Sequence, residues 1–392
     1  MCYDSGDFEE LDNVVTTLSK KRSIIKAGVT KMVQRCLEWV APEAATSPEK
    51  MKIIETIRNV TEGKIYLEIE RARVTRILGN ILEMEMGKVE DAARVMCDLQ
   101  VETFGSLDKR EKVDFILEQM RLAILTNEYQ KATLMSRKLT NKTFQAEGFA
   151  DLKLRYLNLI MKLALYDQRY LDCSRNYWSM LETYRQLAKD SEKANADETS
   201  EAVSAFKMAI IFAVLAPHSN EQSGVINQLY GERRLLDNLP IYRELLRTFL
   251  TEELIRWPAV EQAFGTELRG FPDLFSNDSK SVQRWAHLKD RVIEHNIRVI
   301  SRFYSTVTMS RFAQLLEQPA LEAESKLAAL VGSGMVTAKI NRTTGVISFG
   351  VTKPVDTILN KWTFSVDHLL ALLAKTNHQI AKEEMINSVS SR

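Results

Sequence analysis

Proline is missing from a long central stretch of the chain. None occurs between Pro48 and Pro217, although the sequence of 392 residues contains 8 prolines. Proline lacks a backbone N–H and clashes inside a helix, whereas β-rich domains use it in their turns. The long stretch without proline therefore predicts continuous α-helices and argues against a β-rich domain.

Apolar side chains in this stretch recur with the period of an α-helix. One helix face is formed by Val113, Ile116, Leu117, Met120 and Ile124. The following segment has two apolar faces, made by Phe149, Leu152, Tyr156, Leu159 and Leu163 and by Leu154, Leu157, Met161 and Leu165. A helix with two apolar faces lies between neighbouring helices, as in a stacked array.

The stretch also contains an internal repeat, in which a polar turn precedes a large apolar residue and, three positions later, a small residue. These residues pair as Val89 with Ala92, Tyr129 with Ala132, and Tyr170 with Cys173. Successive large residues are about 40 positions apart, a period typical of solenoids built from helix pairs. We therefore expect a mainly α protein with a right-handed α-solenoid of helix pairs similar to tetratricopeptide repeats. The small residue would let the paired helices approach closely.

Two polar segments divide the chain. Residues Ala188–Glu201 are charged and nearly free of large apolar side chains, which predicts a loop between repeats. Residues Arg269–Ser281 concentrate Gly, Pro, Asn, Asp and Ser, which predicts a loop before a second domain. The expected domains are a solenoid at 1–270, a compact module at 282–352 and a C-terminal helix at 355–392.

The compact module is expected to begin with three helices. The first carries an apolar stripe at Trp285, Leu288, Val292, His295 and Val299. The second is short, with Ser310 as its cap. The third begins near Ala320 and ends at Gly332 or Gly334, since glycine adopts the left-handed conformation at low cost.

A β-hairpin follows the third helix. The strand Val336–Ile340 alternates apolar and polar side chains, and the loop Asn341–Gly345 closes on a glycine suited to positive φ. Ile347 and Phe349 resume the buried alternation. Three helices and a hairpin predict a winged helix.

Winged helices often bind nucleic acid, but the residues of this one do not favour it. The third helix offers Glu322, Glu324, Ser325 and Lys326, and we expect Glu322 and Lys326 to pair at i, i+4. Arg342 is the one base in the hairpin loop, and the chain as a whole has a net charge of +1. We therefore expect no nucleic-acid partner.

Two surfaces are expected to contact other proteins. A hairpin leaves an edge strand whose unpaired backbone groups can add a neighbour's strand. The C-terminal helix carries an apolar stripe that must pack on its own domain or on partner helices. The candidate interface residues are Thr337, Lys339, Val346 and Ser348 on the hairpin, and Val366, Leu369, Leu370, Leu373 and Ile380 on the helix.

The sequence offers no recognisable catalytic chemistry. It lacks a P-loop, a dinucleotide fingerprint, an HExxH motif and a GxSxG motif. Its four cysteines are far apart, and its five histidines show no metal-ligand spacing. There is no signal peptide at the N-terminus and no apolar run long enough to span a bilayer. We expect an intracellular protein with no catalytic residues, cofactor, metal site or membrane partner.

The order of solenoid, winged helix and terminal helix resembles the PCI proteins. These build the proteasome regulatory lid, the COP9 signalosome and a translation initiation factor complex. Long strings across almost the whole chain are similar to the lid branch of this family. They are "GKIYLEIERARVTRIL" from Gly63, "LQVETFGSLDKREKVDFILEQMRL" from Leu99, "VLAPHSNEQS" from Val214, "RWAHLKDRVIEHNIRVISRFYSTVTMSRFAQLL" from Arg284 and "HQIAKEEMI" from His378.

The chain departs from the family at 188–201 and 269–281. It also starts within a repeat, as if an upstream segment were missing.

The resemblance implies a non-catalytic scaffold subunit of the 26S proteasome lid that supports lid assembly and ubiquitin-dependent protein degradation. Its partners would be other PCI lid subunits, the lid metalloprotease deubiquitinase, and the proteasome ATPase ring or core particle. It would act in the cytoplasm and nucleus. The alternatives are a subunit of the COP9 signalosome or of a translation initiation factor complex, and a winged-helix nucleic-acid binder.

Overall fold

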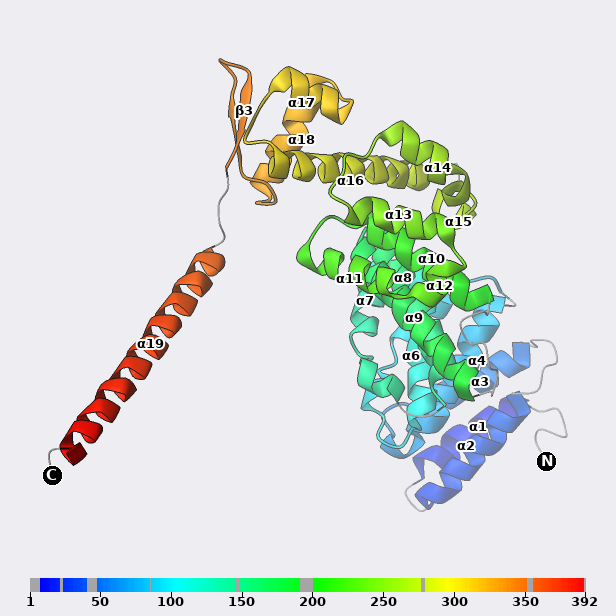
Figure 1. Cartoon of the computed structure of the whole chain (residues 1–392). Helices are drawn as coiled ribbons and strands as arrows, with labels where there is room; N and C mark the ends of the chain where they lie inside the picture. The colour runs from blue at the N-terminus through cyan, green and yellow to red at the C-terminus, as the bar shows by residue number, and fades with distance from the viewer. Residues whose placement is uncertain are drawn as a thin grey trace. The chain divides into compact units, whose positions relative to one another are not determined.

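A computed structural model describes residues 8–21, 24–40, 48–84, 86–145, 148–190, 200–275, 279–350 and 355–390. The chain divides into two compact units, Met1–Leu246 and Arg247–Arg392, which are described separately. Figure 1 shows the elements of each unit.

The first unit is built from helices. They are α1 (Phe8–Lys20), α2 (Lys26–Val40), α3 (Pro48–Thr61), α4 (Glu68–Met84), α5 (Val89–Cys97), α6 (Lys109–Leu125), α7 (Tyr129–Ser136), α8 (Ala150–Tyr166), α9 (Tyr170–Asp190), α10 (Ser200–Leu215), α11 (Asn220–Gly231), α12 (Arg233–Asp237) and α13 (Pro240–Leu250), whose last residues belong to the second unit. Short 3-10 turns lie at Ile65–Leu67, Val101–Thr103 and Asn141–Gln145. Successive helices pack on one another, α4 on α5, α6 on α7 and α8 on α9, which confirms the predicted helical solenoid.

The internal repeat marks the turn inside each helix pair. The large residues Val89, Tyr129 and Tyr170 begin α5, α7 and α9. Two positions earlier, the backbone is left-handed, at Gly87 (φ 63°), Asn127 (φ 58°) and Gln168 (φ 56°). The small residues Ala92, Ala132 and Cys173 are each 0% exposed. The repeat therefore combines a left-handed turn with a small side chain where the two helices meet.

A chain of alternating charges joins the first helices of successive pairs. It runs across α4, α6 and α8 through Glu83, Arg121, Glu118, Arg155, Asp114 and Arg76. Glu83 lies 2.5 Å from Arg121, and Glu118 lies 2.7 Å from Arg155. The hydrogen bond from Arg121 lowers the pKa of the Glu83 carboxyl below its usual value, although burial acts in the opposite direction.

The second unit contains the winged helix. Its helices are α14 (Trp257–Arg269), α15 (Pro272–Phe275), α16 (Ser279–Phe303), α17 (Met309–Leu316), α18 (Ala320–Gly332) and α19 (Val355–Ser390). Its strands are β1 (Thr306–Thr308), β2 (Ala338–Asn341) and β3 (Val346–Phe349), arranged antiparallel in the order β1-β3-β2. Side chains from α16, α17, α18 and the sheet share one core. It includes Ile297, Phe312, Leu327 and Ile347, each 0% exposed.

Two details of the predicted winged helix were wrong. The cap of α17 is Thr308 rather than Ser310, because its hydroxyl accepts a hydrogen bond from the Arg311 N–H. Lys326 pairs across to Asp290 on α16, at 2.7 Å, rather than with Glu322 on its own helix. The cap residue Thr308 is the last residue of β1, and the partner of Lys326 lies on α16. The spacing of residues along α17 and α18 therefore did not reveal either contact. Gly334 and Gly345 have positive φ, as predicted.

Helices take in parts of both segments that the sequence predicted as loops. Residues 188–190 belong to α9 and 200–201 to α10, while 191–199 lie outside the described residues. The second predicted loop contains α15 at Pro272–Phe275, and α16 already begins at Ser279. Helix therefore continues into polar sequence at both places.

The close approach at the repeat turn can be tested by enlarging its small side chain. We predict that Ala132→Leu lowers the free energy of unfolding by about 1–3 kcal/mol, because a buried site without spare volume must rearrange around the new atoms. Urea unfolding followed by circular dichroism measures the change. Leu134→Ala is the control, since Leu134 is 59% exposed and its loss should be nearly neutral. Equal midpoints for Ala132→Leu and the parent chain would contradict tight packing at the turn.

The charge chain should make stability depend on pH. Because the folded pKa of Glu83 is lowered, its pairing stabilises the fold above the ordinary value of 4.5 and is lost as the pH falls through the folded pKa. We predict that Glu83→Gln costs about 1–3 kcal/mol at neutral pH and progressively less in acid.

Denaturant titrations of Glu83→Gln and the parent at several pH values test this. The control is Glu38→Gln, which breaks an exposed pair with Arg35 and should cost about 0.5 kcal/mol or less. A cost for Glu83→Gln that does not change with pH would exclude the charge pair as its cause.

Candidate interaction surfaces

The small sheet of the winged helix has one hairpin strand at its edge. Strand β3 lies in the centre: Ser348 pairs with Thr306 of β1 on one side and with Lys339 of β2 on the other. Val346 likewise has partners on both sides. The backbone of β3 is therefore engaged by both neighbours, and β2 is the hairpin strand at an edge of the sheet.

The candidate residues of the hairpin therefore lie on different strands: Val346 and Ser348 on the central strand β3, the others on or just before the edge strand β2. Lys339 is exposed on the edge strand β2. Thr337, just before β2, donates its hydroxyl to the Gly350 carbonyl, and the Gly350 N–H donates to the Thr337 carbonyl at 3.0 Å. Sequence reasoning missed β1 because a strand of three residues, Thr306–Thr308, directly after a helix is too short to show alternation.

The bases beside the wing are engaged in ion pairs. Arg342 lies 2.7 Å from Glu324 of α18, and Lys326 is held by Asp290. Among the described residues of α18 and the hairpin, Lys339 is the remaining base outside an ion pair. Specific nucleic-acid binding usually neutralises several phosphates, so the charges of this wing do not favour it.

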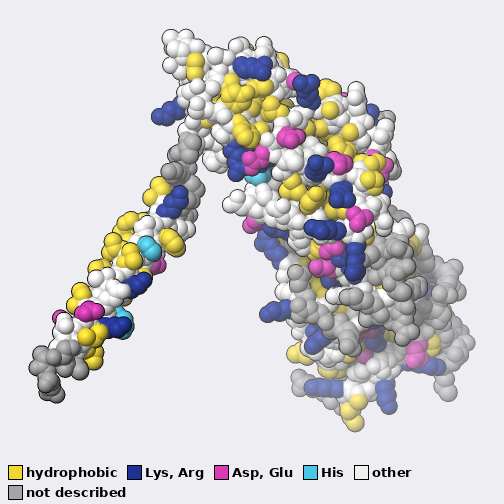
Figure 2. Space-filling model, viewed as in Figure 1, with side chains coloured by type: hydrophobic (Ala, Val, Ile, Leu, Met, Phe, Trp, Pro, Cys, Tyr) yellow, Lys and Arg dark blue, Asp and Glu magenta, His cyan; other side chains and the backbone are white. Residues whose placement is uncertain are grey.

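Helix α19 exposes a long apolar surface. Every side chain described between 358 and 387 is exposed, and Figure 2 shows hydrophobic side chains along the helix. The five candidate residues are 37–58% exposed: Val366, Leu369, Leu370, Leu373 and Ile380. Exposed apolar surface on this scale is typical of sites that contact another molecule, and the five interface residues stay a prediction.

The apolar surface of α19 is wider than the sequence reasoning foresaw. Ile358, Leu359, Trp362, Phe364 and Leu372 are each at least 51% exposed as well. In the sequence, Leu359, Trp362 and Val366 are spaced by three and four residues. This helical spacing could have identified Leu359 and Trp362 as part of the apolar surface. A helix that is apolar on several sides fits between more than one neighbouring helix.

Helix α16 carries a buried histidine, His295, and two half-buried ionisable groups, Glu294 and Arg298. The ring of His295 is buried, with Nε2 3.1 Å from the Glu253 carbonyl and an edge-to-face contact with the ring of Phe249. Burial raises the pKa of the Glu294 carboxyl, although Arg291 opposes this, and burial lowers the pKa of Arg298. Within the described part of the chain, no group of three or more His, Cys, Asp or Glu residues could hold a metal ion.

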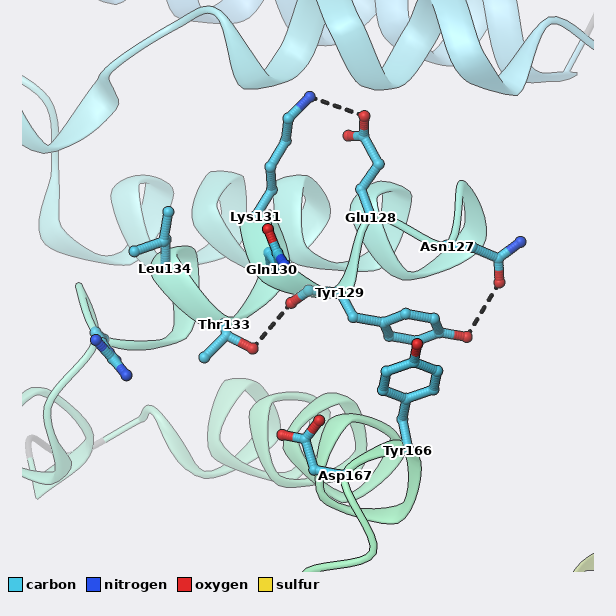
Figure 3. A pocket seen from close by; sticks show the side chains of 10 residues that line it. Asn127, Glu128, Tyr129, Gln130, Lys131, Thr133, Leu134, Tyr166 and Asp167 are labelled. Carbon is cyan, nitrogen blue, oxygen red and sulfur yellow. Dashed lines mark hydrogen bonds and ion pairs between the residues drawn. The ribbon is translucent and has the colours of Figure 1, made fainter. Parts of the chain in front are cut away.

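One surface pocket lies at the turn between α6 and α7 and the end of α8. It has a volume of about 800 Å³. Figure 3 shows Tyr129 stacked on Tyr166, with ring centres 3.7 Å apart. The Tyr129 hydroxyl donates to Asn127, and Glu128 pairs with Lys131 at 2.8 Å. These polar groups bind one another in the repeat turn, an arrangement that stabilises the turn.

The helices described here include none that is both long enough and apolar enough to cross a membrane.

The fold and its surfaces define a PCI-type subunit, with helical repeats, a winged helix and a terminal helix. Three family models agree with this. The model described as PSMD12/CSN4, N-terminal, matches residues 1–189, the PCI domain model matches 268–351, and the model of the 26S proteasome regulatory subunit RPN5 C-terminal domain matches 356–388.

Comparison with curated relatives shows to which branch of the PCI proteins the chain belongs. The chain is 37% identical to 26S proteasome regulatory subunit rpn501 of Schizosaccharomyces pombe, covering 99% of this chain and 85% of that protein. It is 36% identical to 26S proteasome regulatory subunit RPN5 of Saccharomyces cerevisiae, covering 98% and 84%. The chain belongs to the RPN5 family of 26S proteasome regulatory subunits. COP9 signalosome complex subunit 4 of Drosophila melanogaster is more distant, 24% identical over 83% of this chain and 76% of that protein.

Proposed function

We propose that this chain is a non-catalytic scaffold subunit of the 26S proteasome regulatory particle lid, supporting lid assembly and ubiquitin-dependent protein degradation. The observation that carries the proposal is the 37% identity to a 26S proteasome regulatory subunit over 99% of the chain. The more distant similarity to a signalosome subunit makes that complex the weaker alternative. The chain would work in the cytoplasm and nucleus, where it would need no cofactor or metal of its own.

The proposed roles follow the three parts of the chain. The solenoid, at 1–270, presents a long surface to neighbours. The winged helix, at 282–352, associates with other PCI subunits through its edge strand β2, near Thr337 and Lys339. The helix at 355–392 joins a bundle of partner helices, because its apolar surface is exposed over the range that the RPN5 C-terminal model matches. The lid deubiquitinase and the ATPase ring or core particle are the further partners.

Affinity purification of the tagged chain tests the assignment. Mass spectrometry should recover other lid subunits of the 26S proteasome. Recovery of signalosome or initiation-factor subunits in their place would contradict it.

The role of α19 can be tested in the same purification. Leu369→Asp combined with Leu373→Asp places two charges where apolar contacts are proposed, and desolvating a charge in such a contact is costly. We predict at least a tenfold lower recovery of lid subunits, with an unchanged unfolding midpoint because both side chains are exposed in the isolated chain.

The matched control is His378→Asp combined with Lys382→Asp, which places two aspartates four residues apart on another face of the same helix. Its recovery of lid subunits should stay close to that of the parent chain. Equal recovery for the leucine double variant and the parent would exclude the proposed bundling surface.

A further inference from the structure

Three successive repeats of the solenoid end their first helix on an exposed apolar side chain. Met84 is the last residue of α4, Leu125 of α6 and Tyr166 of α8, and they are 81%, 54% and 52% exposed. Single exposed apolar residues are common on protein surfaces. Here the exposure recurs at the same position of three neighbouring repeats, and we call these three residues the exposed row. Helix α10, which follows, ends on Leu215, a buried residue.

The exposed row runs across the ends of neighbouring helices. Glu83, one position before Met84, lies 2.5 Å from Arg121 of α6, and α6 packs on α8. Packed helices have their axes about 8–10 Å apart. Successive members of the row are therefore expected to lie about one helix spacing apart along the solenoid.

This spacing matches the repeat of an α-helix laid across the row. A helix rises about 1.5 Å per residue, so side chains seven positions apart are separated by about 10.5 Å. Such side chains also lie on nearly the same face, because seven residues make almost two full turns. Three apolar side chains at i, i+7 and i+14 can thus meet Met84, Leu125 and Tyr166 in turn.

The pocket beside Tyr166 provides room for the last of these side chains. Tyr166 and Leu134, which is 59% exposed, both line this cavity of about 800 Å³. The stack of Tyr166 on Tyr129 fixes the ring and still leaves half of its surface exposed (Figure 3). The third position of the row therefore combines an apolar wall with a hollow.

The charges of this pocket favour an acidic residue on the partner. Two acids of its lining are already paired, Glu128 with Lys131 at 2.8 Å and Asp167 with Arg169 at 3.1 Å. Arg137 also lines the pocket, is exposed, and forms no ion pair within the described part of the chain. A guanidinium group binds a carboxylate through two parallel hydrogen bonds, so Arg137 fits an aspartate or glutamate.

We propose that the exposed row binds an amphipathic helix of a partner protein. This helix carries apolar side chains every seven residues, and an acidic residue beside the apolar side chain that enters the pocket. Docking of a helix through regularly spaced apolar side chains is a common mode of recognition. The proposal goes beyond the assignment to the lid, because it names a surface of the solenoid and the chemistry of its partner.

The spacing is tested by fluorescence anisotropy on the full chain with two labelled peptides of equal length and composition. Both are rich in alanine so that they form helices, and both carry three leucines with a glutamate beside each end leucine. In one peptide the leucines are seven residues apart. In the other they are eleven residues apart, which keeps them on one face but separates them by about 16.5 Å.

We expect the peptide with the shorter spacing to bind at least tenfold more tightly. Equal binding of the two peptides, or binding of neither, would overturn the proposal.

The row itself is tested with Leu125→Ser. Because Leu125 is exposed, the unfolding midpoint should stay the same, whereas binding of the matched peptide should weaken several-fold. Ile65→Ser is the control, since Ile65 is 79% exposed in the same unit and lies outside the row. Should Leu125→Ser shift the midpoint, Met84→Ser makes the same test at the end of the row. Equal binding by the row variant and the control variant would overturn the proposal.

The charge contact is tested with a third peptide, in which glutamine replaces the two glutamates of the matched peptide. The parent chain should prefer the glutamate peptide several-fold, and Arg137→Gln should bind both peptides equally. A glutamate preference that survives in Arg137→Gln would overturn the proposed contact. None of these results depends on the recovery of lid subunits, so this proposal and the proposed function fail separately.

Discussion

The close contact between the two helices of each repeat is the constraint on which the solenoid depends. Ala92, Ala132 and Cys173 are fully buried where the second helix of each pair begins, and a left-handed residue precedes each of them. The short turn and small side chain leave the large apolar faces of α6 and α8 free to pack between neighbouring pairs. The charge chain from Glu83 to Arg155 then ties the first helices of successive pairs together.

The winged helix and α19 differ in whether their apolar side chains are covered. In the winged helix, apolar side chains of α16, α17 and α18 meet the sheet in one core. In α19, apolar side chains of the same kind remain exposed. A buried core needs no other molecule, whereas an exposed apolar helix gains free energy by being covered. This contrast, together with membership of the RPN5 family, supports the scaffold role.

Patterns with a fixed period could be read from the sequence, and contacts between distant segments could not. The repeat at Val89, Tyr129 and Tyr170 predicted the start of three helices because one turn geometry recurs. The strand β1 escaped notice, and with it the central position of β3, because three residues show no period. The hydrogen bond from Gln34 of α2 to Glu70 of α4 was equally invisible, since it joins residues 36 positions apart. The candidate interface residues on α19 rest on periodicity, and their contacts stay a prediction.

Hydrogen–deuterium exchange of α19 tests the central claim most directly, because it compares the same backbone amides alone and in the complex. An isolated helix in water opens readily, whereas a helix packed in a bundle is protected. The account predicts fast exchange between Val366 and Ile380 in the isolated chain, and strong protection when the chain is purified within the proteasome lid. Exchange at the same rate in both states would contradict it.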